Sequence, residues 1–273
     1  HGTIKPLRTE FSLPNASLPP FLLKIVEQYL GGYRLGQINV SADGDFSLVD
    51  GNIVSTMRSS VRHSQGGNTL RQLPSLHLEM RHELSANPGL KQLELRQLQL
   101  TLAEAGREIA ALRLSSPFLW NAAVPDTMSE NPSLTIQFSR FPLAYINIAT
   151  GDKDANIKQG YLNGKIQTVL GRRDKLLVLK GLLRTEELTV SMPGVSTPVH
   201  STLGLDFNAR LRDFKQWELA GLDLQVVDGT AAVLSVNLTG EGNIATGLGK
   251  FKLQLANLNG RTWSLLPPSI TAK

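Results

Sequence analysis

The chain has 273 residues, of which 41% are hydrophobic and 19% are charged, a composition typical of a folded protein. It contains no cysteine, which excludes disulfides, thiolate metal sites and cysteine nucleophiles. The net charge is +5, and the basic residues are spread along the chain. Nucleic acid is not an expected partner, because no recognition helix or aromatic-interleaved basic strand accompanies this charge.

The first element along the chain is a predicted amphipathic helix. Residues 19–32 open with two prolines, close with two glycines and carry apolar residues at helical spacing between them. This pattern predicts a helix of about ten residues. A second short helix is expected at 143–151, where the segment is shorter and richer in β-branched residues.

Strand signals dominate from residue 35 onward. Alternating apolar and polar residues predict strands at 35–41, 46–49, 52–57, 76–80, 90–102 and 108–114, and again at 165–169, 175–179, 182–190, 203–211, 217–227 and 231–238. Turns are predicted between them at Asp43–Gly44, Asp50–Gly51, Pro88–Gly89, Asp228–Gly229 and Gly240–Gly242. The pattern is typical of an antiparallel meander.

Two of these strands are nearly the same sequence. Residues 93–102 and 217–226 both alternate, both slip by one residue, at Arg96–Gln97 and at Ala220–Gly221, and then alternate in the opposite phase. Each slip predicts a β-bulge. The match extends upstream, so we expect tandem units of roughly 120–125 residues at 1–131 and 132–249, with the truncated start of a third unit at 250–273.

Motifs for catalysis and cofactor binding are absent from the sequence. It holds no nucleophile elbow, phosphate-binding loop, dinucleotide fingerprint or zinc-binding helix motif. The five histidines share no common spacing, and the acidic segments Asp43–Asp45 and Asp152–Asn156 are better interpreted as Asx-type turns than as calcium loops. The sequence therefore predicts a non-enzymatic protein with no catalytic residues, no metal site and no cofactor.

Two clusters of basic residues, Arg172–Lys175 and Arg58–His63, have two interpretations. Each is either a solvated turn or a contact for anionic lipid head groups. No stretch of 18 apolar residues occurs, so a helix that spans a membrane is not expected within this sequence.

Alternation also predicts an extensive apolar sheet face. Its expected lining residues are Leu93, Leu95, Leu98, Leu100, Leu102, Leu203, Leu205, Phe207, Leu219, Leu222, Leu224 and Val226. Such a face is either covered by a second layer, as in a sandwich, or open as a groove for lipid chains. A closed membrane-spanning sheet would alternate similarly, but 6% aromatic residues are few for two interfacial girdles.

The layout resembles the AsmA/TamB-like family of bacterial envelope proteins. The resemblance rests on the opening strand and helix at 11–31, the glycine steps at 32–36 and 160–164, the paired leucine ladders, and the alanine-rich strands at 109–112 and 231–234. It implies an elongated antiparallel sheet, curled into a groove or incomplete barrel, with a short helix per repeat. The segment beginning His1–Gly2–Thr3 is expected to be part of a longer chain.

The resemblance also implies a function. The expected protein binds or conducts phospholipid, or another acyl-chain lipid, along the groove and supports outer-membrane lipid homeostasis. It would be periplasmic, tethered to the inner membrane by a segment outside this sequence, and other envelope proteins are possible partners. The alternative is a periplasmic or extracellular β-sandwich that recognises carbohydrate or protein, with Trp120, Trp217 and Trp263 as the aromatic candidates.

Overall fold

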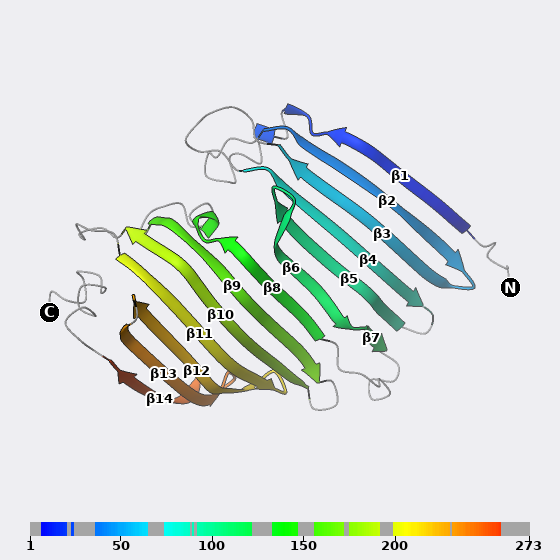
Figure 1. Cartoon of the computed structure of the whole chain (residues 1–273). Coiled ribbons are helices and arrows are strands. Elements are labelled where there is room, and N and C mark those ends of the chain that lie inside the picture. Colours follow the sequence, from blue (N-terminus) through cyan, green and yellow to red (C-terminus); the bar gives the residue numbers. More distant parts are fainter. Residues whose placement is uncertain are drawn as a thin grey trace. The chain divides into compact units, whose positions relative to one another are not determined.

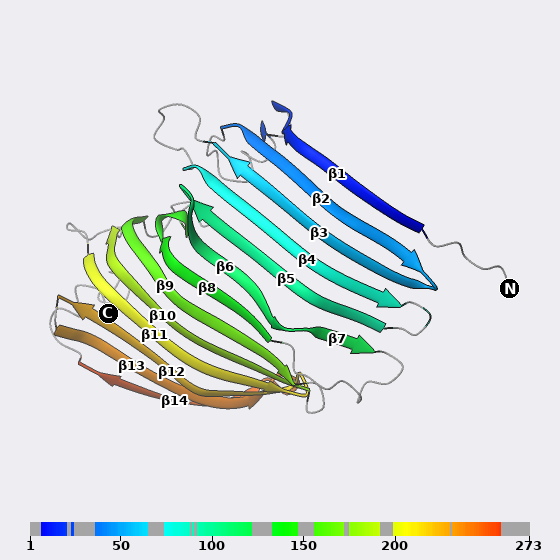
Figure 2. The same ribbon diagram turned by 45° about the vertical axis from the view of Figure 1, so that its right-hand side comes forward.

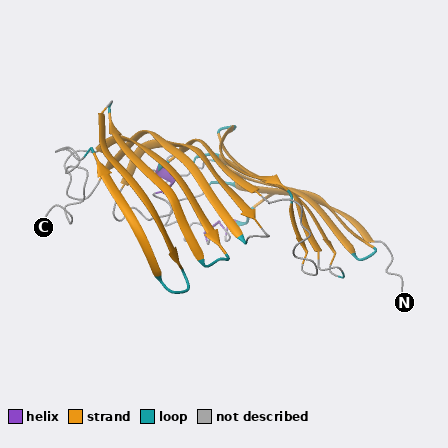
Figure 3. Cartoon of the chain, turned by 90° about the horizontal axis from the view of Figure 1, so that it is seen from below, coloured by secondary structure: helices purple, strands orange, loops and turns teal. Residues whose placement is uncertain are grey.

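A computed structural model gives the fold of the chain. It describes residues 7–20, 23–24, 36–64, 74–87, 89, 92–121, 133–146, 156–171, 175–191, 199–229 and 231–257. Strands make up nearly all of this described part (Figure 3). They are β1 (Leu7–Ser17), β2 (Ile38–Val49), β3 (Asn52–His63), β4 (Leu76–Asn87), β5 (Gln92–Glu104), β6 (Arg107–Ser116), β7 (Phe118–Asn121), β8 (Ser133–Pro142), β9 (Asn156–Gly171), β10 (Leu176–Ser191), β11 (Val199–Arg212), β12 (Gln216–Asp228), β13 (Ala231–Asn243) and β14 (Leu248–Ala256).

The strands follow one another in a single antiparallel, open sheet, as the alternation predicts. Hydrogen bonding runs from β1 to β6, continues with β8 and ends at β14, so β1 and β14 are its edges (Figure 1). Strand β7 pairs with the first residues of β5, and β6 pairs with the later ones. Pro117, which has no amide hydrogen to donate, separates β6 from β7.

The chain divides into two compact units. The first comprises residues 1–136 and 169–173, and the second comprises residues 137–168 and 174–273. Strands β1 to β7 belong to unit 1 and β10 to β14 belong to unit 2. Within unit 2 the strands bend along their length (Figure 2). The predicted tandem repeats, with their boundaries at residues 131 and 249, stay a prediction.

Two-residue turns join several hairpins. Asp50 and Gly51 connect β2 to β3 with φ of 50° and 77°, and Ala105 and Gly106 connect β5 to β6 with φ of 48° and 81°. Positive φ at both turn residues matches the right-handed twist of the flanking strands, and glycine adopts it without steric cost. The predicted turn at Asp50–Gly51 is therefore confirmed, as is the turn at Asp228–Gly229.

Two other predicted turns are wrong. Asp43–Gly44 lies inside β2, so the strand signals on both sides of Gly44 belong to one long strand. Gly240–Gly242 lies inside β13, and the turn follows it at residues 244–247. The Asx-type turn expected at Asp43–Asp45 is wrong for the same reason. The second such segment, at residues 152–156, and the turn at Pro88 lie largely outside the described residues.

Most of the two predicted helices also lies outside the described residues. Helical conformation is described at Pro20, Leu23 and Lys24, and again from Ala144 to Ile146. In the first segment the amide of Leu23 donates to the carbonyl of Pro19 at 3.2 Å. The predicted amphipathic character of either helix stays a prediction.

The two predicted bulges are confirmed by the strand register. In β5, Gln97 pairs with Glu83 and Leu95 pairs with Leu84, which leaves Arg96 without a partner residue in β4. In β12, Gly221 pairs with Asn208 and Leu219 pairs with Ala209, which leaves Ala220 unmatched in β11. Each strand therefore carries one extra residue at the slip in its alternation.

A second pair of bulges follows the hairpins of the same strands. Register shifts make Ile109 an extra residue of β6 relative to β5, and Val233 an extra residue of β13 relative to β12. Both side chains are fully buried. Ile109 and Val233 are 124 positions apart in the sequence, the same separation as between Arg96 and Ala220. The units thus share two bulges at the same spacing, one exposed and one buried.

Candidate functional site

In unit 1 the register collects apolar side chains on one face of the sheet. Paired residues of neighbouring antiparallel strands share a face. Leu102 pairs with Leu78, Leu98 with His82, and Leu93 with Ala86. Because the Arg96 bulge absorbs the slip, all five predicted leucines of β5 lie on this face. The face continues across β3, β2 and β1 through Val61, Met57, Ile53, Val40, Phe46, Leu48, Leu7, Phe11 and Leu13.

Unit 2 repeats this arrangement. Leu203 pairs with Val226, Leu205 with Leu224, and Phe207 with Leu222. The Ala220 bulge keeps Leu219 on the same face. All seven predicted residues of this unit therefore share one face. The face also includes residues that the prediction omitted, namely Leu177, Leu179, Leu183, Trp217, Leu234, Val236, Leu238, Phe251, Leu253 and Leu255.

Aromatic rings cover glycines on these apolar faces. Phe11 pairs with Gly44, Phe207 with Gly181, Phe251 with Gly240, and Trp217 with Gly242. A Cβ at any of these glycines would crowd the ring opposite. Trp217 and Phe251 also stack on each other with ring centroids 5.0 Å apart. The rings thus occupy the space that a side chain at each glycine would fill.

The apolar faces are only partly shielded from solvent. Of the twelve predicted lining residues, Val226 alone is buried, and the other eleven are partly exposed. All described strands belong to one sheet, so no second described sheet covers either face. The two-layer sandwich expected as one alternative is therefore not formed by the described strands.

The opposite face of unit 1 is polar and laced with ion pairs. The Glu79 carboxylate forms ion pairs with Arg58 and Arg81, each at 2.8 Å. The hydrogen bond from Arg81, followed by the charge of Arg58, holds the pKa of Glu79 below its ordinary value of 4.5. Arg96 pairs with Glu94 at 2.9 Å and Glu83 at 3.4 Å, which raises the Arg96 pKa, mainly through the hydrogen bond to Glu94.

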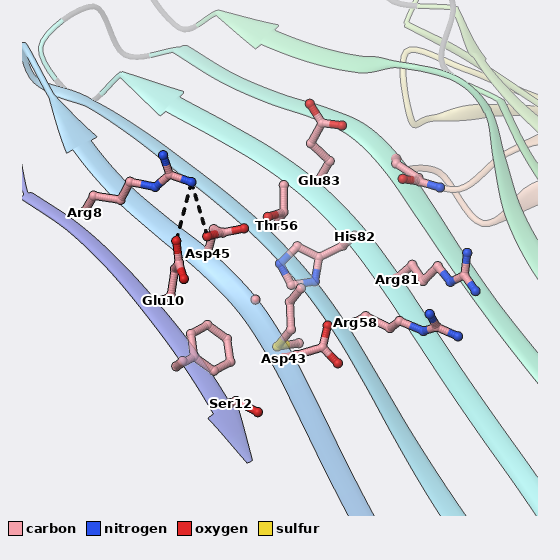
Figure 4. Close-up of a pocket in the computed structure, with 14 residues that line it drawn as sticks. Arg8, Glu10, Ser12, Asp43, Asp45, Thr56, Arg58, Arg81, His82 and Glu83 are labelled. Atoms are coloured by element: carbon pink, nitrogen blue, oxygen red, sulfur yellow. Dashed lines mark ion pairs between the residues drawn. The ribbon is translucent and has the colours of Figure 1, made fainter. Parts of the chain in front are cut away.

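A depression of about 650 Å³ lies over β1 to β5 and is lined mostly by side chains of this polar face. Arg8 extends toward Glu10 and Asp45, at 3.7 Å from each, and Arg58 and Arg81 lie side by side on neighbouring strands (Figure 4). Its charges neutralise one another across strands. Ion pairs of this kind stabilise a solvated surface.

The histidines of the described residues have contacts of other kinds. His63 is buried, accepts a hydrogen bond from the Gly36 amide at Nε2, and contacts the Pro74 carbonyl through Nδ1 at 2.9 Å. It therefore holds the segments that precede β2 and β4. His77 and His82 lie on opposite faces of β4, the polar and the apolar face respectively. Among the described residues, no group of three histidine or acidic side chains could hold a metal ion.

The aromatic candidates for carbohydrate recognition do not form a common site in the described part. Trp217 lies on the apolar face over Gly242 and Gly249. Trp263 and the side chain of Trp120 lie outside what the structure describes. No helix among the described residues is both long and apolar enough to cross a membrane.

Comparisons with known proteins give no relative for this chain. No family model, no curated protein and no solved structure matches it.

Proposed function

We propose that the apolar face of each unit binds the acyl chains of phospholipids. The observation that supports this proposal is the pair of bulges at Arg96 and Ala220. Without them half of each leucine ladder would point to the polar face. With them the apolar residues continue on one face along strands of 13 residues, about 43 Å at about 3.3 Å per residue, which exceeds the roughly 15 Å that the acyl chains of one leaflet span in a bilayer.

Acyl chains suit this face better than a rigid polar ligand. The lining residues are mostly leucines, valines and aromatic rings, with Ser55, Ser59 and His82 among them in unit 1. All of the predicted lining residues except Val226 remain partly exposed. Each methylene group buried against such a surface contributes about 0.8 kcal/mol. A lipid shorter by two carbons per chain should therefore bind about tenfold or more weakly.

The proposal also includes a location for the protein in the cell. The resemblance to AsmA/TamB-like proteins supports a location in the periplasm of a Gram-negative envelope and a sheet curled into a groove of tandem repeats. In that setting, lipid moving along the groove would serve outer-membrane lipid homeostasis. Neither step requires a cofactor or a catalytic residue.

Native mass spectrometry tests the proposal. The purified chain should carry phospholipid, and Leu98→Asp and Leu222→Asp should each lower the bound fraction about tenfold or more, since a charge on the face opposes acyl contact. The matched controls are Gln99→Asp and Gln225→Asp, which place the same carboxylate on the polar faces of the same strands. The controls should retain lipid.

Two results would contradict the proposal. One is a folded chain that never carries phospholipid, even after incubation with micelles. The other is equal lipid loss in the Asp variants of both faces. Because Leu98→Asp or Leu222→Asp could unfold the chain, Leu98→Ala and Leu222→Ala provide milder versions whose folding is checked by circular dichroism.

A further inference from the structure

Three hairpin ends lie together at one end of the unit 2 strands (Figure 1). They are Lys175 before β10, the turn 212–215 between β11 and β12, and the turn 243–248 between β13 and β14. The amide of Asp213 donates to the Lys175 carbonyl at 3.0 Å, and the amide of Ile244 donates to the Lys215 carbonyl at 2.8 Å. These residues form one continuous border, named here the tip edge.

The tip edge exposes large apolar side chains. The exposed fractions are 57% for Phe214, 60% for Ile244 and 73% for Leu248. At the other end of the same strands, the described residues of the β12–β13 turn are Asp228 and Gly229, which are polar or small. Ile146, in the connection before β9, is 39% exposed. Among the described turn residues of this unit, the most exposed large apolar side chains therefore lie at the tip edge.

The backbone holds Phe214 in a position that its side chain disfavours. Asp213 and Phe214 have φ of 50° and 53°, in the left-handed region where glycine or asparagine is preferred. A bulky aromatic residue there is strained, and strained residues cluster at functional sites. Packing of the ring does not offset this backbone strain, because the Phe214 side chain is mostly exposed. A role outside the fold explains it better.

The same border is basic. Lys175, Arg212 and Lys215 are exposed, and among the described residues none of them forms an ion pair. Asp213 is the acidic residue of these turns. The nearby Glu218 of the polar face is engaged by Arg210 at 3.8 Å. Exposed apolar side chains between unpaired cations are complementary to an anionic lipid surface.

We propose that the tip edge docks on the surface of an anionic lipid bilayer. Phe214, Ile244 and Leu248 enter the boundary between head groups and acyl chains, and the three cations contact the head groups. The apolar face of unit 2 begins directly behind this border, at Leu211 and Trp217. The inference goes beyond the binding of single lipids and does not require it.

Vesicle flotation tests the docking. The whole chain should float with phosphatidylcholine vesicles that contain phosphatidylglycerol and bind pure phosphatidylcholine much more weakly. Reversing Lys175, Arg212 and Lys215 to Glu should weaken binding about fivefold per residue or more. The double variant Phe214→Ser, Ile244→Ser should weaken it by about tenfold per residue.

The matched control reverses three exposed lysines of the same unit, Lys165, Lys180 and Lys252, so the net charge changes equally. The register places Lys180 and Lys252 on the polar face. This control should float nearly as well as the unaltered chain. Equal loss in the control, unchanged flotation of the tip variants, or equal binding to both kinds of vesicle would overturn the proposal. Lipid carried in solution by folded tip variants would show that their failure to dock is separate from acyl binding.

Discussion

Several glycines of this chain have a structural role that depends on the residues opposite them in neighbouring strands. Gly44, Gly181, Gly240 and Gly242 all interrupt strand signals, and two of the predicted turns were placed on them. Each instead lies within a strand, opposite an aromatic ring of the neighbouring strand. A glycine inside a strand pattern also indicates close approach by another group. The sequence does not reveal which ring faces it, because that depends on register.

At the scale of single residues, we predict that Gly181→Ala destabilises the chain. The added Cβ would overlap the Phe207 ring, and overpacking of this kind costs about 1–3 kcal/mol. Gly204→Ala is the matched control on the next strand, where the nearest atom would be 4.0 Å away. That change should be neutral or stabilise by up to about 1 kcal/mol, because it restricts the unfolded chain.

Urea unfolding of the two variants measures the difference. If Gly181→Ala is as stable as Gly204→Ala, the Phe207 ring does not rest on Gly181 and the flat packing of this face is wrong. A compensating Phe207→Leu substitution in the Gly181→Ala background should recover part of the lost free energy of unfolding, since the smaller side chain leaves room for the methyl group.

At the scale of strands, the bulges were predictable because they leave a trace in the sequence. A one-residue slip in an otherwise regular alternation has to be absorbed if one face is to stay apolar. The slips at Arg96–Gln97 and at Ala220–Gly221 predict one extra residue in each strand, and the register has it at Arg96 and at Ala220. The bulges at Ile109 and Val233 went unpredicted, because they lie within runs of apolar residues that show no alternation to interrupt.

Deletion of Arg96 tests the role of the bulge. Without the extra residue, Leu93 and Leu95 rotate to the polar face, and we expect a loss of about 2–4 kcal/mol in the free energy of unfolding. Arg96→Ala is the matched control. It keeps the bulge and removes only ion pairs of a half-exposed side chain, which contribute about 0–1 kcal/mol. Similar unfolding midpoints for the two variants would show that the ladder does not depend on the bulge.

At the scale of the molecule, alternation predicted the antiparallel class but not what covers the apolar face. Alternation along the strands indicates that one face of the sheet is apolar, and both a sandwich and an open sheet satisfy that condition. The lining residues on β5, β11 and β12 were found because their ladders are regular. The prediction omits those on β10, although Leu177, Leu179 and Leu183 alternate too, because it divides this strand at Gly181. It also omits those on β14.

The open sheet leaves β14 with one paired neighbour among the described strands, and its apolar side chains are exposed, at 65% for Phe251, 57% for Leu253 and 50% for Leu255. Exposed edges of this kind pair with other chains. We therefore expect the chain to self-associate as its concentration rises. Leu253→Lys should shift this association to about tenfold higher concentration, because a desolvated lysine opposes edge pairing.

Leu182→Lys is the matched control for this edge. Leu182 is also exposed, at 44%, but β10 is paired on both sides, so a lysine there leaves the edge unchanged. Sedimentation velocity over a concentration series compares the two. If Leu182→Lys weakens association as much as Leu253→Lys, association depends on general surface hydrophobicity. If the unaltered chain stays monomeric throughout, the edge of β14 is protected, and its exposed leucines need another partner to explain them.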